Sequence, residues 1–386
     1  MSAIIELNAA PTRQVTDWVA LVHEELGPRF AQRAAAADES DRFVADNYAD
    51  LKAAGLTAAG VPLELGGSGA PHAEMSEVIR ALGRYCGSTA LAFSMHTHQV
   101  MMAQWRWRNQ KAPLEGLLKR VAAERIILLS SGGSDWLHGS GTATRVDGGY
   151  RINARKIFSS GSPAGDLLLT SAVYEDPEAG PTVLHFGVPM NAPGVTIDPV
   201  WRALGMRATG SHDIVLNEVF VPDAAIGGKR PQGKWHMLFH IVALIAIPLV
   251  YSAYLGVAEA ARDLAVRQAR QRRIDGHQRG RVGAMDTELA AARLALADMV
   301  AMGSSAAPGP ETTNRIFIGR GLVERAAIAT VEHAMEVFGG AAFHRDLGIE
   351  RLFRDVQGAR FHPLTGSVQR DYAGCIALGL DPDGIR

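Results

Sequence analysis

The sequence predicts an α+β protein in which an N-terminal helical domain, a middle antiparallel β-domain and a C-terminal helical bundle follow one another. Apolar residues recur at helical spacing up to about residue 124, alternate at strand spacing from about 126 to 224, and return to helical spacing after residue 233. Short strands with no helices between them are typical of an antiparallel barrel or sandwich. We therefore expect three domains, at residues 1–124, 125–228 and 229–386.

The composition is that of a large globular protein. Of 386 residues 47% are hydrophobic, and 39 Lys and Arg balance 40 Asp and Glu. This balance argues against a globally basic nucleic-acid-binding protein and against an acidic disordered chain. Cys86 and Cys375 are far apart and lack metal-ligand spacing, so we expect no disulfide framework and no metal site. With no signal-peptide pattern at the N-terminus, a cytoplasmic protein is expected.

The first part contains two segments with clear helical signals. Ser40 or Asp41 can cap a helix over residues 43–54, which ends before Gly55, and residues 75–85 repeat apolar side chains at helical spacing. The glycines and prolines of the segment between them, residues 61–71, predict a loop.

The middle part contains a hairpin signal and further strands. Residues 141–158 form two alternating runs around Asp147-Gly148-Gly149, which predicts a β-hairpin. Turn residues separate three more alternating runs, at 166–174, 182–190 and 212–222.

The last part consists of long helices. Residues 255–271, 287–302 and 321–338 read as helices, with a turn at 304–313. The segment 237–258 has no Asp, Glu, Lys or Arg and is long enough to span a bilayer. His240, the internal Pro248 and the lack of a basic anchor favour a buried core helix instead, so we expect no membrane association.

This order of elements, with these glycine positions, resembles the acyl-CoA dehydrogenase superfamily of flavoenzymes over nearly the whole chain. Each short motif is weak alone, but six occur in the family's order and at suitable intervals. They are GLTAAGVPLELGGSGA (55–70), SSGGSDW (130–136), RINARKIFSSGS (151–162), WRALGMRATGSHDIVLNEVFVP (201–222), EVFGGAA (336–342) and IERLFRDV (349–356).

Two of these motifs point to the ring of a flavin. Small residues let backbone N–H groups approach a planar, electron-accepting ring, and hydroxyl groups can bond its edge. The resemblance implies that Ser131 and Ser134 contact the flavin, and that Phe158, Ser159 and Ser160 lie beside its ring, with Ser160 in a catalytic role. The alternative is a Gly-Ser turn and a strand end without a ligand.

The other half of the cofactor is less clearly marked. The arginine-rich segment 267–281 could clamp a pyrophosphate or a coenzyme A phosphate, meet nucleic acid, or be a solvated helix end. Asp275 and Glu336 replace the phenylalanine and glutamine of many relatives, and a carboxylate near a pyrophosphate is unfavourable. FAD and FMN therefore both stay open. By resemblance, five further residues contact the cofactor: Arg272, Gly339, Gly340, Thr365 and Gln369.

The segment ARFHPLTGSVQ (359–369) decides between reactions. Many dehydrogenases of the family have a glutamate at this point that removes a proton from an acyl-CoA thioester, but here the position holds Pro363, which cannot be a general base. The alternative glutamate site, in residues 246–252, has no carboxylate. His362 stands beside the gap, and an imidazole can take or give a proton near neutral pH.

The pattern resembles the flavin-dependent monooxygenase branch of the superfamily, the dibenzothiophene monooxygenase type. That resemblance makes His362 and His96 candidate catalytic residues and Trp201 a candidate substrate contact, although a lone histidine is more often structural. It implies reduced flavin and O2 as co-substrates, a small apolar substrate, and a homotetramer. A separate flavin reductase is expected because the sequence has no nicotinamide-binding fingerprint.

Three other functions stay open. An acyl-CoA dehydrogenase could use a displaced base, and Glu332, Glu336 and Asp355 are the candidates. A flavin-binding scaffold without turnover is the non-enzymatic alternative. A nucleic-acid binder rests only on the arginine-rich segment and is the weakest of the three.

Overall fold

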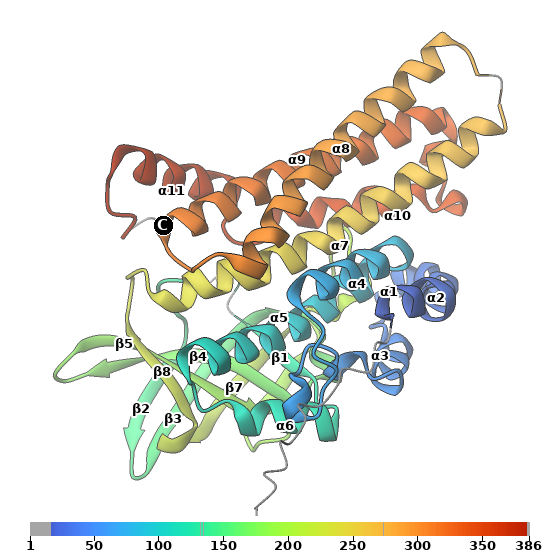
Figure 1. The fold of residues 1–386 in the computed structure, drawn as a ribbon. Coiled ribbons are helices and arrows are strands. Elements are labelled where there is room, and N and C mark those ends of the chain that lie inside the picture. Colours follow the sequence, from blue (N-terminus) through green and yellow to red (C-terminus); the bar gives the residue numbers. More distant parts are fainter. Residues whose placement is uncertain (1–16, 132, 134, 273, 384–386) are drawn as a thin grey trace, which may run out of the picture.

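The computed structural model describes residues 17–131, 133, 135–272 and 274–383. It confirms the predicted α+β fold class, because one set of helices lies between a β-sheet and a second set of helices (Figure 1). Within the first set, α5 packs against both β1 and α7. The first set consists of α1 (Trp18–Leu21), a π-helical turn (Val22–Leu26), α2 (Gly27–Glu39), α3 (Ala45–Ala53), α4 (His72–Tyr85), α5 (Gly87–Gln110) and α6 (Glu115–Glu124).

The sheet is mainly antiparallel, as predicted, and has the strand order β6-β7-β3-β2-β4-β5-β8. β1 pairs with β4 in parallel, and β2 also pairs with β4 in parallel over two residues. The β2–β3 hairpin supplies the long connection that a parallel pairing needs. The strands are β1 (Leu128–Ser130), β2 (Thr142–Val146), β3 (Gly149–Ser159), β4 (Leu167–Asp176), β5 (Gly180–Pro189), β6 (Val195–Asp198), β7 (His212–Pro222) and β8 (Ile226–Pro231).

The C-terminal helices assemble around α7. It is long and apolar enough to cross a membrane, but 94% of its most apolar window is buried inside the protein, which confirms a core helix. Pro248 lies inside α7 without ending it. The helices of this part are α7 (Met237–Arg270), α8 (Gly276–Ser305), α9 (Pro310–Phe338), α10 (Ile349–Val356) and α11 (Gly366–Leu378).

Local signals placed several turns correctly. Gly55 adopts φ +82° and follows the end of α3, and Gly148 adopts φ +72° in the turn of the β2–β3 hairpin. These are backbone conformations that glycine reaches without strain. The predicted cap of α3 is wrong, because Ser40 donates to Ala36 O at the end of α2 and Asp41 pairs with Arg207.

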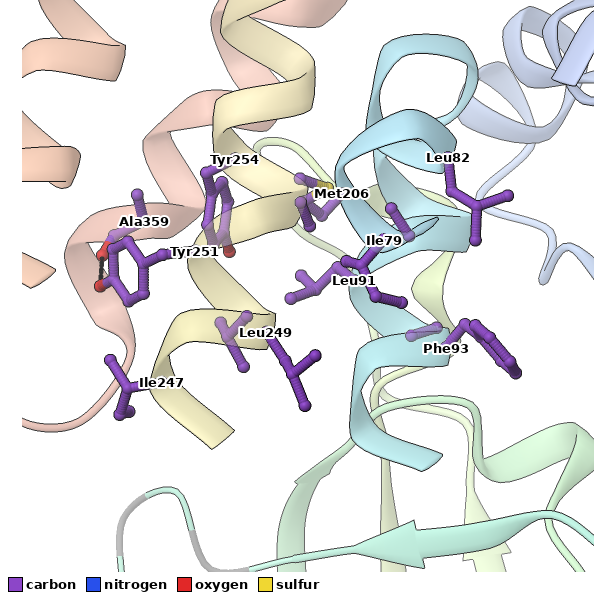
Figure 2. Close-up of a cluster of buried hydrophobic side chains, with 14 of the residues drawn as sticks. Ile79, Leu82, Leu91, Phe93, Met206, Ile247, Leu249, Tyr251, Tyr254 and Ala359 are labelled. Atoms are coloured by element: carbon purple, nitrogen blue, oxygen red, sulfur yellow. Dashed lines mark hydrogen bonds between the residues drawn. The ribbon is translucent and has the colours of Figure 1, made fainter. Parts of the chain in front are cut away.

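The core where α4, α5 and α7 meet also contacts the segments that carry the candidate site. Figure 2 shows Met206 between α7 and the helices that carry Ile79 and Leu91. On the other side of α7, Tyr251 points towards Ala359 and donates to its carbonyl oxygen at 2.6 Å. The loop around Met206 and the segment after α10 are therefore both fastened to one rigid helical core.

Candidate functional site

The end of β3 presents an aromatic side chain at the surface. Phe158 has φ +57°, which is rare for a bulky residue, and a register shift in the β3–β7 pairing spans this point. Its ring is 56% exposed and meets the edge of Trp201, with ring centroids 6.1 Å apart. Strained backbone of this kind clusters at ligand sites. The structure thus brings two of the predicted site residues together.

The two serines after Phe158 point to different surroundings. Ser159 is fully buried, and its hydroxyl donates to the carbonyl of Lys156 at 3.3 Å. Ser160 is 8% exposed, and its Oγ lies 2.7 Å from the Oγ of Ser211. Ser211 in turn lies 2.7 Å from Thr209 Oγ1, which donates to a backbone carbonyl. Both serines are therefore buried, and Ser160 is the one whose hydroxyl joins a series of other side-chain hydroxyl groups.

The loop after β1 was predicted to contact the flavin through two serines. Ser131 Oγ lies 2.7 Å from Thr170 Oγ1, so its hydroxyl is fixed against β4. Ser134 lies outside the described residues.

A buried ion pair, which the sequence did not reveal, holds the rest of this loop. The Lys156 ammonium contacts Asp135 Oδ2 at 2.9 Å and both the carbonyl and the hydroxyl of Ser140 at 2.9 Å. Burial lowers the pKa of Lys156, and Asp135 opposes that shift. The signal was the presence of a lysine in one motif and an aspartate in another, but nothing local pairs them.

The backbone of Met206 holds both Trp201 and Thr209 in place. The carbonyl of Met206 accepts from Trp201 Nε1 at 3.2 Å and from Thr209 Oγ1 at 2.9 Å. Its N–H donates to Asp355 Oδ1 at 2.5 Å. Burial raises the pKa of Asp355 to about 6, although the Met206 N–H bond opposes this. Asp355 is therefore a support of the 201–209 loop.

His362 is fixed by buried groups from two helices. Its Nε2 lies 2.6 Å from the hydroxyl of Tyr254 on α7. Arg320 on α9 is fully buried, stacks over Tyr251 and pairs with Glu324. Its guanidinium donates to three carbonyls of this segment, those of Ala359, Arg360 and His362.

These surroundings set the protonation state of His362. Burial, together with the positive charge of Arg320, lowers the pKa of His362 to about 4. The imidazole is therefore neutral at pH 7. Within the described residues, Nδ1 of His362 makes no hydrogen bond. It is also not among the fully buried polar atoms that lack a partner. This nitrogen is free for a ligand.

His96 has no such freedom. Its Nε2 donates to the carbonyl of Thr57 at 2.8 Å, and its Nδ1 accepts from the N–H of Leu128 at 3.0 Å. Burial lowers its pKa to about 4. Both ring nitrogens are thus used by the backbone, and His96 fastens α5 to the start of β1.

The arginine-rich segment closes the end of a helix. Arg272, Gln278 and Arg281 donate to the last carbonyls of α9, those of Phe338, Val337 and Glu336. The last carbonyls of a helix lack the usual intrahelical donors, so cationic and amide donors are favourable there, and that of Glu336 also accepts from the Gly339 N–H. Gly339, with φ +65°, and Gly340 follow directly. Arg273, which also belongs to the arginine-rich segment, lies outside the described residues.

The remaining predicted contacts lie elsewhere in the chain. Thr365 is the exposed residue before α11, and Gln369 is buried against Gly321 of α9. From Gly321 to the end of α9 is about 26 Å, at 1.5 Å per residue. One copy of the chain therefore does not bring Thr365 and Gln369 to Arg272, Gly339 and Gly340.

The displaced carboxylates proposed for a dehydrogenase do not gather near His362. Glu332 and Glu336 are exposed on α9, where Glu336 lies 3.3 Å from His333. They lie about 18 Å or more along the helix from Arg320, which holds the His362 segment. Asp355 is buried and occupied by the Met206 N–H.

Comparison with known proteins agrees with this architecture across the chain. Residues 15–114, 130–219 and 248–372 match the N-terminal, middle and C-terminal domains of acyl-CoA dehydrogenase. YdbM of Bacillus subtilis, named as an acyl-CoA dehydrogenase, is 30% identical over 365 residues, which cover 88% of this chain and 91% of YdbM.

Two further similar proteins are a monooxygenase and a protein whose structure contains FMN. Dibenzothiophene monooxygenase of Mycolicibacterium goodii is 28% identical over 377 residues, covering 88% of this chain and 89% of that protein. The structure of KijD3 in complex with FMN and a dTDP-sugar matches with a TM-score of 0.86 and 26% identity, covering 97% of this chain and 98% of KijD3. The chain belongs to the acyl-CoA dehydrogenase superfamily.

Proposed function

We propose that the protein is a flavin-dependent monooxygenase that uses reduced flavin and O2 to oxidise a small, apolar substrate. The observation that carries this proposal is Pro363 at the expected position of the catalytic carboxylate, beside a neutral His362 held by Tyr254. The similarity to dibenzothiophene monooxygenase and to an FMN-binding structure supports it.

The residues at the end of β3 fit a flat ring with a polar edge. Phe158 offers an exposed ring that packs against the half-buried Trp201, while Ser131 and Ser160 offer hydroxyl groups. Reduced flavin, when bound, supplies the electrons that activate O2. We assign Ser159 to holding the strand end, because its hydroxyl is used by the Lys156 carbonyl.

His362 is the proposed acid–base residue. Its neutral imidazole can hold a proton for, or pass one to, a substrate or reduced oxygen through the free Nδ1. His96 is not retained as a catalytic residue, because both of its nitrogens serve the backbone.

FMN suits the chain better than FAD. Arg272 and Arg281 are engaged with the end of α9, which carries Glu336, and Asp275 follows Arg272 by three positions. A pyrophosphate would have to compete for these arginines. We further propose a cytoplasmic homotetramer that receives reduced flavin from a separate reductase.

Anaerobic titration with chemically reduced FMN, followed by mixing with O2, tests the proposal. We expect uptake of reduced FMN and slower release of H2O2 than from free reduced FMN. Butyryl-CoA, added anaerobically to the protein with oxidised flavin, should not bleach it. Bleaching would instead support a dehydrogenase, and failure to take up any flavin would support neither enzyme.

A matched pair of variants tests the histidine. His362→Ala should retain flavin binding but alter the division of O2 between H2O2 and reaction product, with indole as the probe substrate. His344→Ala, at an exposed histidine, is the control and should behave as the parent protein does. Equal behaviour of the two variants would remove His362 from the proposed chemistry.

A further inference from the structure

The hydroxyl groups of Ser160, Ser211 and Thr209 form a continuous chain. Successive oxygens lie 2.7 Å apart, and the chain ends where Thr209 Oγ1 contacts the carbonyl oxygen of Met206 at 2.9 Å. All three residues are buried, with Thr209 fully buried and Ser211 and Ser160 3% and 8% exposed.

The carbonyl at the inner end sets the direction of every bond. A carbonyl only accepts, so the single hydroxyl hydrogen of Thr209 points to Met206. Thr209 must then accept from Ser211, and Ser211 in turn must accept from Ser160. The only hydroxyl hydrogen of Ser160 is therefore donated to Ser211. Its remaining lone pairs can only accept a hydrogen bond.

The backbone keeps this geometry in place. The N–H of Gly161 donates to the carbonyl of Thr209 at 2.8 Å, and the Ser162 hydroxyl donates to that of Gly210 at 2.9 Å. A Cβ at Gly210, which has φ +56°, would approach Phe43 and Pro163 to less than 3.0 Å. Only glycine allows the two segments to come this close.

An accept-only group at a flavin edge distinguishes two redox states of the ring. Nitrogen N5 of oxidised flavin is a bare acceptor, whereas N5 of reduced flavin carries a hydrogen and donates. Two facing acceptors leave a polar pair unsatisfied, and a donor facing an acceptor forms a hydrogen bond. Hydrogen bonds to ring nitrogens are a recognised means of tuning a flavin.

We propose that Thr209 and Ser211 are positioning residues that make Ser160 an obligate acceptor and so bias the site towards reduced flavin. This inference rests on the proposed function, since it requires the flavin ring at the end of β3. It gives a role to residues of the 201–211 segment that touch no ligand themselves.

The test compares the affinities of the protein for reduced and oxidised FMN under anaerobic conditions. The parent protein should bind reduced FMN more tightly. Thr209→Val and Ser211→Ala remove one hydroxyl each, so Ser160 can turn its hydrogen outward. Each should lower the affinity ratio about fivefold to tenfold, the worth of one hydrogen bond. A tenfold change in the ratio corresponds to about 30 mV in the midpoint potential of bound FMN.

Conservative variants distinguish the effect of losing a hydroxyl group from the effect of misfolding. Thr209→Ser and Ser211→Thr retain the hydroxyl groups and should retain the ratio, and thermal unfolding checks that all four variants fold. An unchanged ratio in Thr209→Val and Ser211→Ala, or equal affinity of the parent protein for both redox states, overturns this inference alone. Failure of the parent protein to bind either form of flavin overturns the proposed function as well.

Discussion

The imidazole of His362 lies in surroundings that favour its neutral form. Tyr254 occupies one nitrogen, and the buried guanidinium of Arg320 holds the backbone beside it. A protonated imidazole would add a second positive charge to a buried site, which is why its pKa falls to about 4. The same arrangement fits a group that receives a proton only briefly during a reaction.

This shift predicts a pH dependence of stability. The unfolded chain protonates His362 at about pH 6.5, whereas the folded protein resists protonation down to about pH 4. The unfolded state therefore binds more protons between these values, and acidification across that window costs up to about 3 kcal/mol. In His362→Gln this part of the loss should disappear. Urea unfolding at pH 7 and pH 4.5 measures the difference, and an equal loss in both proteins would contradict it.

Asp355 gives a pH dependence of stability of the opposite sign to that of His362. Burial raises its pKa to about 6 in the folded protein, so the folded state holds the proton more firmly than the unfolded chain does. Its contribution to stability is full below about pH 4 and is lost as the pH rises through 6.

A pair of variants tests this assignment. Asp355→Asn retains an acceptor for the Met206 N–H but removes the buried charge, so it should raise the free energy of unfolding at pH 7.5 by up to about 3 kcal/mol. Asp355→Ala should not show this gain, because the buried Met206 N–H loses its acceptor. Chemical denaturation at pH 7.5 and pH 4 distinguishes them. Stabilisation by Ala as large as that by Asn would show that the hydrogen bond is unimportant.

At the scale of elements, α4, α7 and α8 are joined by one carboxylate. Glu259 on α7 is 1% exposed and pairs with Arg80 and Arg84 of α4 and with Arg293 of α8. Burial alone would raise its pKa, but the hydrogen bonds and charges of Arg80 and Arg293 hold that pKa below its usual range.

Breaking this network should be costly. Glu259→Gln leaves three arginines around a neutral side chain, and we expect a loss of about 3 kcal/mol or more. Glu124→Gln removes the exposed Arg120–Glu124 pair of α6 and should cost less than about 1 kcal/mol. Urea unfolding at pH 7 compares the two. Similar small losses would mean that solvent screens the Glu259 network.

Elements defined by neighbouring residues could be predicted from the sequence, and those defined by distant partners could not. The β2–β3 hairpin follows from Asp147-Gly148-Gly149, and α7 from its unbroken apolar run. In the candidate site, the motifs located Phe158, Ser160 and His362. Their partners Ser211, Tyr254 and Arg320 lie 51, 108 and 42 positions away from the atoms they contact. No local pattern reveals such a pairing, because it depends on strand register and helix packing.

At the scale of the whole molecule, the α9 helix separates two groups of predicted cofactor contacts. Gln369 packs near its Gly321, while Arg272 closes its far end at Phe338. The proposed homotetramer would allow a second copy to complete what one chain leaves about 26 Å apart. Large apolar side chains exposed on the C-terminal part of the chain suit an interface: Ile318 and Leu322 on α9, Leu378 on α11, and Phe343 and Phe361 in the segments before and after α10.

Ile318 and Leu322 offer the most direct test of assembly, since they lie one helical turn apart on α9 and are 42% and 43% exposed. Replacing both by lysine puts charges into the proposed interface, where burial is unfavourable, so light scattering should show a smaller oligomer. Ile318→Val with Leu322→Met keeps the surface apolar and should preserve the assembly. Because the residues proposed to bind the flavin ring at β3 belong to one chain, the lysine variant should keep its affinity for FMN. An unchanged mass would place the interface elsewhere, and a loss of FMN binding would mean that the flavin ring itself needs two copies.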